Sequence, residues 1–200
     1  MRTLVIETAT EACSAALFED GELVAGAYEI LGRGHAERLV PMIAELPDKG
    51  RADRVVVSLG PGSFTGVRIG VAAARALGLA RQAEVLGYPS LALVAAMARE
   101  AYPGPVTVCM AGGHGEWFVQ DFGADGLPEA EALSLAPDAA KGRHRHPAVT
   151  GSRAAELAGR EGIALELLPD GRRFALIPAA LLTPNLAPLY GRPPDARLPA

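Results

Sequence analysis

The segment from Arg54 to Gln82 constrains the fold more than any other part of the chain. It begins with RVVVSL over residues 54–59, a continuous apolar run typical of a strand buried on both faces. A tight Gly60-Pro61-Gly62 turn follows, and a long helix is predicted from Ser63 to Gln82. A buried strand that leads directly into a helix indicates an α/β fold, in which helices cover the sheet.

This predicted helix carries a stripe of small residues. One side is almost bare because they recur at every fourth position: Gly66, Gly70, Ala74 and Gly78. A glycine inside a helix costs about 1 kcal/mol relative to alanine, so close packing against a neighbour must compensate. The remaining surface is also largely apolar, so the helix must be covered on two sides. Its own sheet accounts for one side, and either the segment 35–46 or a second protein accounts for the other.

The N-terminal half alternates strands and helices in the order β-β-β-α-β-α-β-α, and the second half repeats this pattern in a shortened form. The helix over 35–46 contains Pro41, which is expected to kink or loosen it, and Ser90 is expected to cap the third helix. Tyr102-Pro103-Gly104-Pro105 marks the boundary between the halves. The predicted domains are residues 1–101 and 102–192, with a tail over 193–200. The expected strands are 3–6, 13–18, 23–30, 54–59, 85–87, 106–111, 117–122, 148–150 and 163–168; the expected helices are 35–46, 63–82, 90–101, 153–161 and 173–182, and 138–147 is expected to be a solvated loop containing His144 and His146.

The chain carries no recognisable catalytic or metal motif. Gly66 is followed by Val67 with no lysine nearby, which excludes a Walker A loop, and the spacing does not fit a dinucleotide-binding fingerprint. The four histidines form no zinc-type pair, and Ser63 does not lie in a nucleophile elbow. We therefore predict no catalytic residue and no metal site. A weak anion or cofactor contact is left open only at Glu7, Thr8, Thr10, Gly60 and Gly62.

The composition narrows the choice of partners and compartment. The formal net charge of −4 over 200 residues disfavours a protein that grips nucleic acid through a basic surface, so any RNA contact is expected through another chain. Cys13 and Cys109 are expected to be buried thiols in a reducing compartment. No signal peptide opens the sequence, and no apolar run is long enough to span a bilayer, so we expect a cytoplasmic protein without a membrane partner.

Several motifs resemble known proteins. A strand that ends in Glu7-Thr8-Ala9-Thr10 and continues into a hairpin resembles the phosphate loop of the actin-like, sugar-kinase and Hsp70 superfamily. Together, ETATEACSAALFEDGE (7–22), GHAERLVPMI (34–43) and GPGSFTGVRIG (60–70) are similar to the bacterial TsaB (YeaZ) family. The resemblance covers residues 1–97; beyond them GEWF (115–118) and PLYGRPP (188–194) match only in outline.

The resemblance implies an α/β fold of the actin-like/Hsp70-like (ASKHA, RNase H-like) class with two lobes, the second shortened. It also implies a non-catalytic subunit that binds and activates a TsaD-type threonylcarbamoyltransferase subunit, joined by a TsaE-type ATPase, for modification of tRNA adenosine 37. Such a chain has no cofactor of its own, meets a nucleotide only at the partner interface, and reaches tRNA indirectly. Whether the free chain forms a homodimer is left open.

In this family the pairing surface is formed by the two helices of the N-terminal lobe. Here these are the predicted helices 35–46 and 63–82, where the pattern of small and apolar residues already called for a neighbour. The expected partner-binding residues are His35, Leu39, Met42, Ile43, Phe64, Arg68, Ile69, Ala72, Ala73 and Ala76.

The sequence also departs from the family pattern. Glu7 replaces the usual aspartate, no glycine follows it in 8–10, Ala111-Gly112-Gly113 replaces Asp-Ala-Arg, and the connection 47–53 is short. Lost charges weaken any independent ATP hydrolysis, because nothing would stabilise the transferring phosphate. The alternative interpretation is a small-molecule kinase or ATPase that uses the cleft between the lobes and binds and turns over Mg-ATP by itself. A metalloprotease activity is not supported, because the sequence has no paired histidines that could hold a zinc ion.

Overall fold

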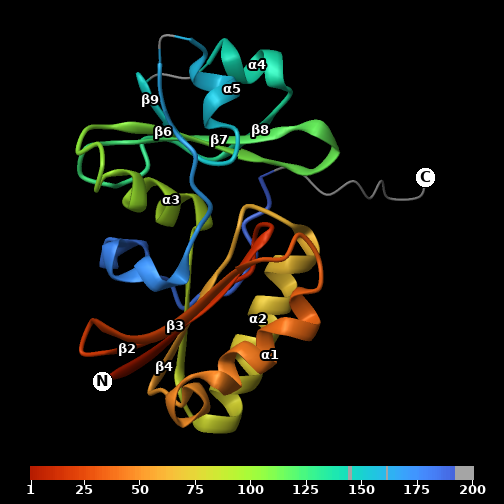
Figure 1. Cartoon of the computed structure of the whole chain (residues 1–200), viewed down its shortest axis with the longest axis vertical. Coiled ribbons are helices and arrows are strands. Elements are labelled where there is room, and N and C mark those ends of the chain that lie inside the picture. Colours follow the sequence, from red (N-terminus) through yellow and green to blue (C-terminus); the bar gives the residue numbers. More distant parts are fainter. Residues whose placement is uncertain (144–145, 161, 192–200) are drawn as a thin grey trace.

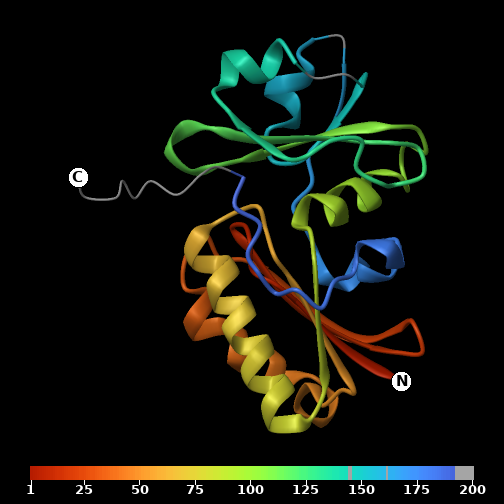
Figure 2. The same cartoon turned by 180° about the vertical axis from the view of Figure 1, so that it is seen from behind.

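The computed structural model describes residues 1–143, 146–160 and 162–191, and Figures 1 and 2 show two sheets separated and flanked by helices. The predicted tail over 193–200, and His144 in the predicted loop, lie outside the described residues. How the chain divides into domains stays a prediction. The chain passes between the two sheets twice, once over residues 89–105 and again after residue 165 (Figure 1).

The first sheet forms as the apolar runs predict. Its order is β3-β2-β1-β4-β5; β1 pairs antiparallel with β2 and parallel with β4, and β4 pairs parallel with β5. An Asp20-Gly21 turn joins β2 to β3, with both residues in the left-handed region that this turn requires. The strands are β1 (Arg2–Glu7), β2 (Ala12–Glu19), β3 (Glu22–Ile30), β4 (Arg54–Ser58) and β5 (Glu84–Tyr88).

The second sheet repeats this topology, which confirms the predicted echo. Its order is β10-β9-β6-β7-β8, where β6 pairs antiparallel with β7 and parallel with β9. β6 thus takes the place of β1, and β9 and β10 take the places of β4 and β5. The strands are β6 (Val106–Ala111), β7 (Trp117–Phe122), β8 (Leu133–Leu135), β9 (Ala148–Thr150) and β10 (Ile163–Leu165).

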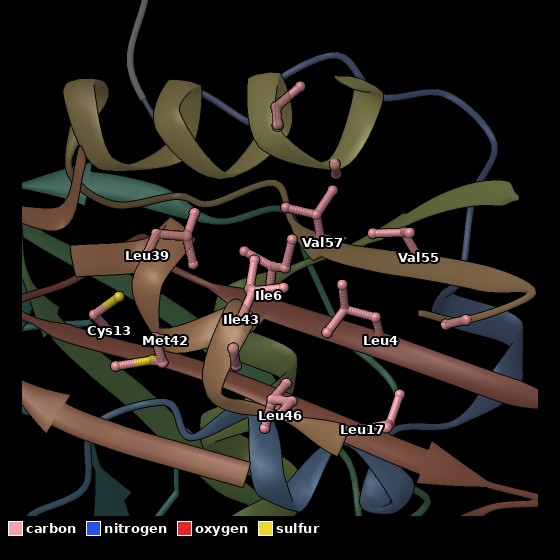
Figure 3. Close-up of a cluster of buried hydrophobic side chains, with 14 of the residues drawn as sticks. Leu4, Ile6, Cys13, Leu17, Leu39, Met42, Ile43, Leu46, Val55 and Val57 are labelled. Atoms are coloured by element: carbon pink, nitrogen blue, oxygen red, sulfur yellow. The ribbon is translucent and has the colours of Figure 1, made fainter. Parts of the chain in front are cut away.

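Helices α1 (His35–Glu45) and α2 (Phe64–Arg81) lie side by side on the outer face of the first sheet (Figure 1). α1 continues through Pro41 to Glu45, and the short connection after it forms the 3-10 helix η1 (Pro47–Gly50). Apolar side chains from α1, α2 and the sheet interlock between them, as Figure 3 shows. The main members of this core are Leu4, Ile6, Cys13, Leu17, Leu39, Met42, Ile43, Leu46, Val55 and Val57.

The space between the sheets holds α3 (Ser90–Ala98) together with the 3-10 helices η3 (Gly171–Leu176) and η4 (Ala179–Leu181) (Figure 2). One side of α3 packs on the first sheet through Leu93, and its other side packs on the second sheet through Leu91 and Val94. The helix predicted over 173–182 is wrong, since these residues form two short 3-10 helices instead. They return to the first sheet, where the Gly171 amide donates to the Ser14 hydroxyl at 2.8 Å.

Three further expectations need correction. α3 ends at Ala98 rather than near residue 101, and its cap is Pro89, so the Ser90 side chain does not cap it. Part of the predicted loop 138–147 is helical, because α4 (Pro137–Lys141) begins with a proline at its first position. α4 and α5 (Ala154–Ala158) cover the outer face of the second sheet, where α1 and α2 cover the first.

Candidate functional site

Glu7 lies at the centre of a polar cluster where three parallel strands end. Because β1, β4 and β5 run in the same direction, their last residues meet at one edge of the sheet: Glu7, Ser58 and Tyr88. The Ser58 hydroxyl donates to Glu7 Oε1 at 2.7 Å, and the Tyr88 hydroxyl donates to Oε2 at 3.1 Å. The amide of Ala9 also donates to Oε1, at 2.7 Å. The carboxyl ends of parallel strands are where α/β proteins commonly bind ligands.

The cluster is sealed from solvent. Glu7, Ser58 and Tyr88 are fully buried, and Glu7 lines neither the cavity of about 970 Å³ nor the one of about 720 Å³. Burial raises the pKa of the Glu7 carboxyl from 4.5 to about 7, against the opposing effect of its hydrogen bonds from Ala9, Ser58 and Tyr88. A carboxyl buried in this way orders the end of β1 and is not presented to a ligand.

The turn after β1 occupies the N-terminus of α2. The Ser63 amide donates to the Ala9 carbonyl at 2.6 Å, and the Thr8 hydroxyl donates to the Gly66 carbonyl at 2.8 Å. A Cβ atom on Gly62 or Gly66 would lie 2.1 Å from a backbone oxygen of this turn, so both positions require glycine. The backbone of this turn therefore packs directly on Gly62 and Gly66.

The remaining weak candidates for a cofactor contact also have structural roles. The Thr10 hydroxyl accepts from the Ala12 amide at 3.2 Å, which closes the β1–β2 turn. Gly60 has a φ of +88° and packs against the carbonyl of Leu189. Of the five candidates, Thr10 and Gly62 line the cavity described next, and Glu7, Thr8 and Gly60 do not. A cofactor contact at any of them stays a prediction.

A cavity of about 970 Å³ lies beside this turn, between the two lobes. Its walls come from the β1–β2 turn, the loop before α1, the start of α2, the hairpin of the second sheet and residues 189–191. Its charged and titratable lining residues are of mixed sign, with Glu11 and Glu37 opposed by Arg33. Among the described residues, no group of three or more histidine, cysteine or acidic side chains is arranged to hold a metal ion.

The second candidate site is the outer face of α1 and α2. The predicted partner residues Phe64, Arg68, Ala72 and Ala76 are exposed there, and Ile69 and Ala73 are half-buried. Two apolar residues that were not among the predicted partner residues extend this face: Val40 is 63 % exposed and Leu79 is 86 % exposed. Together, Val40, Phe64, Arg68, Ala72, Ala76 and Leu79 define what we call the α1–α2 face.

Four of the predicted partner residues do not belong to this surface. Leu39, Met42 and Ile43 are at most 4 % exposed, because α1 turns them towards its own sheet. His35 is 7 % exposed, and its Nε2 lies 3.2 Å from the Ala12 carbonyl oxygen. Their assignment as contact residues is corrected: these side chains support α1 from beneath.

The glycine stripe of α2 faces its own sheet. A Cβ atom at Gly70 would lie 2.5 Å from the Thr8 hydroxyl, and one at Gly78 would lie 2.2 Å from a methyl group of Val85. The stripe therefore lets α2 approach its own sheet closely, and the α1–α2 face lies on the opposite side of the helix. The compensating neighbour is β1, β4 and β5, not a second helix.

Sequence reasoning missed Ser58, Tyr88 and Tyr190. The first two could have been found, because Ser58 lies near the end of the predicted strand 54–59 and Tyr88 directly follows the predicted strand 85–87, and in an α/β sheet the carboxyl ends of such strands meet at one edge. Tyr190 could not, since it reaches Phe64 from the far end of the chain, with ring centroids 5.7 Å apart.

A family model and several known proteins match the chain. The family model described as "TsaD: tRNA N6-adenosine threonylcarbamoyltransferase" matches residues 29–133. The chain is 41% identical over 100 residues to the tRNA threonylcarbamoyladenosine biosynthesis protein TsaB of Escherichia coli, which covers 48% of this chain and 43% of that protein. It is 33% identical over 104 residues to the Bacillus subtilis protein of the same name, covering 50% and 45%. The matched region thus spans less than half the length of these curated relatives.

A solved structure matches over a greater length. YeaZ from Pseudomonas aeruginosa superposes with a TM-score of 0.74 at 28% identity, covering 88% of this chain and 89% of that one. The ethanolamine utilization protein EutJ from Carboxydothermus hydrogenoformans, at 12% identity and a TM-score of 0.50, shares the fold alone. The expected actin-like fold of two lobes is confirmed. No helix in the described part of the chain has both the length and the apolar character needed to cross a bilayer.

Proposed function

The chain belongs to the TsaD family of tRNA N6-adenosine threonylcarbamoyltransferases, as a TsaB (YeaZ)-type member, and on that premise we propose that it works in threonylcarbamoyladenosine biosynthesis as a non-catalytic subunit. In this role it binds the TsaD-type transferase subunit through the α1–α2 face and activates that subunit for modification of tRNA adenosine 37.

The observation that carries this proposal is the apolar character of the α1–α2 face. Three large apolar side chains, Val40, Phe64 and Leu79, are each more than half exposed, and alanines fill the surface between them. Contiguous apolar surface on two parallel-packed helices is typical of a protein–protein contact. Small residues at the centre allow a partner helix to approach closely.

The sealed Glu7 cluster supports a non-catalytic role. An ATPase of the actin-like class needs an acid that reaches a metal-bound water and a loop that cradles phosphate. Here Glu7 is buried against Ser58 and Tyr88. The turn over Thr8 and Ala9 packs directly against the first turn of α2. The kinase or ATPase alternative would place its nucleotide in the cavity between the lobes, and Glu7 does not line that cavity.

The proposal extends to the other members of the system. A TsaE-type ATPase joins the pair, tRNA is reached through the transferase subunit, and the assembly is cytoplasmic. The chain holds no cofactor of its own, and a nucleotide is met only where the partner completes a site. In the absence of the transferase subunit, the same face supports a homodimer.

Co-expression with the transferase subunit tests the proposal. Co-purification in a complex of defined mass, and tRNA modification that requires both chains, is the expected result. Ala72→Asp places a charge at the centre of the face and should abolish both. Ala155→Asp, an exposed alanine of α5 on the other lobe, is the matched control and should leave both unchanged. A complex that survives Ala72→Asp would exclude this face, and saturable Mg-ATP turnover by the isolated chain would favour the kinase or ATPase alternative.

A further inference from the structure

Helix α2 concentrates positive charge on an otherwise acidic chain. Its eighteen residues, FTGVRIGVAAARALGLAR, include three arginines and no acid, whereas the whole chain has a net charge of −4. Arg81 is used internally, because its guanidinium donates to the carbonyls of Lys49 and Gly50. Arg68, which belongs to the α1–α2 face, and Arg75, one turn further along the helix from Ala72, are both exposed.

These two arginines lack the acidic partners that several other arginines of the chain have. Arg38 binds Glu29 and Glu45, Arg54 binds Glu84 and Arg172 binds Asp170; within the described residues, Arg68 and Arg75 form no ion pair.. The Arg75 guanidinium donates only to the Leu186 carbonyl, at 3.5 Å. Both therefore carry a positive charge that nothing in the described chain neutralises.

Arg68 is nevertheless held in a defined position. Its guanidinium carbon lies 3.5 Å from the centre of the Phe64 ring, and its Nε and Nη2 each donate to the Tyr190 hydroxyl at 3.3 Å. The segment 183–191, which we call the C-terminal strap, brings Tyr190 there and is anchored where the Leu189 amide donates to the Leu59 carbonyl at 2.7 Å. Holding the side chain in place lowers the entropy lost when a partner binds it.

The spacing of the two arginines defines a pattern for the partner. Seven residues are two turns of a helix, so Arg68 and Arg75 lie on the same side of α2, about 10 Å apart along its axis. They border the exposed apolar residues Ala72, Ala76 and Leu79. With Phe64 on their other side, the two arginines place fixed positive charges among the apolar side chains of this face.

We propose that Arg68 and Arg75 bind carboxylates on a helix of another protein, spaced about two turns apart, and so make the α1–α2 face select that protein over a second copy of this chain. The inference rests on the proposed function and adds the charge pattern of the partner. In a homodimer formed by opposing α2 helices, arginines would face arginines, because α2 contains no acid. The acids of α1 are Glu37 and Glu45, and Glu45 is already bound to Arg38. Glu37 is therefore the acid of α1 that a second copy could offer to these arginines.

The test compares charge reversal with a matched control, using the TsaD-type transferase subunit as the probe. The double variant Arg68→Glu/Arg75→Glu should bind the transferase subunit on the order of 30- to 100-fold more weakly at low salt, and this loss should shrink as salt is raised. Arg160→Glu, an exposed position after α5, makes a charge change of the same sign far from α2 and should leave affinity within about twofold. If charge reversal disturbs folding, Arg68→Gln/Arg75→Gln should still weaken binding and flatten its salt dependence.

Self-association is the second measurement. The neutral variant Arg68→Gln/Arg75→Gln should strengthen the homodimer of the free chain while it weakens the heterodimer, because it removes the like charges that face each other in the homodimer. Tyr190→Phe should weaken the heterodimer alone, severalfold. Wild-type chain that forms no complex would overturn the proposed function. A normal wild-type complex with unchanged affinity and salt dependence in both double variants would overturn only the charge-selection inference.

Discussion

Replacing Glu7 by glutamine should make the protein more stable at neutral and alkaline pH. The carboxyl is fully buried, and burial raises its pKa from the ordinary 4.5 to about 7. Glutamine is close to the protonated glutamate in shape. Its oxygen still accepts from Ala9 and Ser58, and its amide group meets the Tyr88 hydroxyl, which is free to turn and accept.

The size of the effect follows from the pKa. Each unit is worth 1.36 kcal/mol, so the rise corresponds to about 3 kcal/mol between the protonated and charged forms. The folded chain keeps a proton that the unfolded chain releases above pH 4.5. The stabilising contribution of Glu7 is therefore fully present below pH 4.5 and is lost as the pH rises through about 7. The variant should exceed the wild type by up to about 3 kcal/mol at pH 8, and by much less near pH 5.

Urea unfolding at pH 5, 6, 7 and 8 measures this difference. Only the difference between the two proteins matters, because other titrating groups affect both alike. Glu131→Gln, at an exposed position in the loop before β8, controls for the loss of one negative charge and should give a difference near zero at every pH. A Glu7→Gln effect that is constant from pH 5 to pH 8, or destabilising at pH 8, would refute the assignment of a costly buried carboxylate.

Two further predictions follow from the packing. Gly66→Ala should destabilise the fold by about 3 kcal/mol, since its Cβ would meet the backbone oxygen of Thr8 at 2.1 Å. The control Gly113→Ala, with open space around it, should cost less than about 1 kcal/mol. Thermal unfolding compares the two variants, and equal losses of stability would contradict the close approach at Gly66. The thiols of Cys13 and Cys109 are buried, and burial raises their pKa values to about 11 and about 12, so neither should react with a thiol reagent at pH 8 until the chain unfolds. Rapid labelling of folded protein would show that the core opens there.

Local sequence patterns predicted most of the secondary structure, and their failures share a cause. The strand β4 and helix α2 were found because a β-branched run and a helical period act over neighbouring residues. Residues 173–182 were predicted as one helix, yet they form η3 and η4. Their conformation depends on contacts with β1, β2 and β3, which lie more than a hundred residues away. A local pattern carries no information about such contacts.

The sequence by itself determined that this chain has an α/β fold in two similar halves, and that α2 needs a close neighbour. The period of its glycines is a local property, so the stripe could be read from the residues. Only the tertiary structure decided that β1, β4 and β5 are that neighbour. Which side of a helix turns towards the sheet depends on the packing around the whole helix, which a local pattern does not contain. For the same reason Leu39, Met42 and Ile43 moved from the candidate surface into the core. The contact of Arg68 with Tyr190 joins residues 122 positions apart, and only folding brings them together.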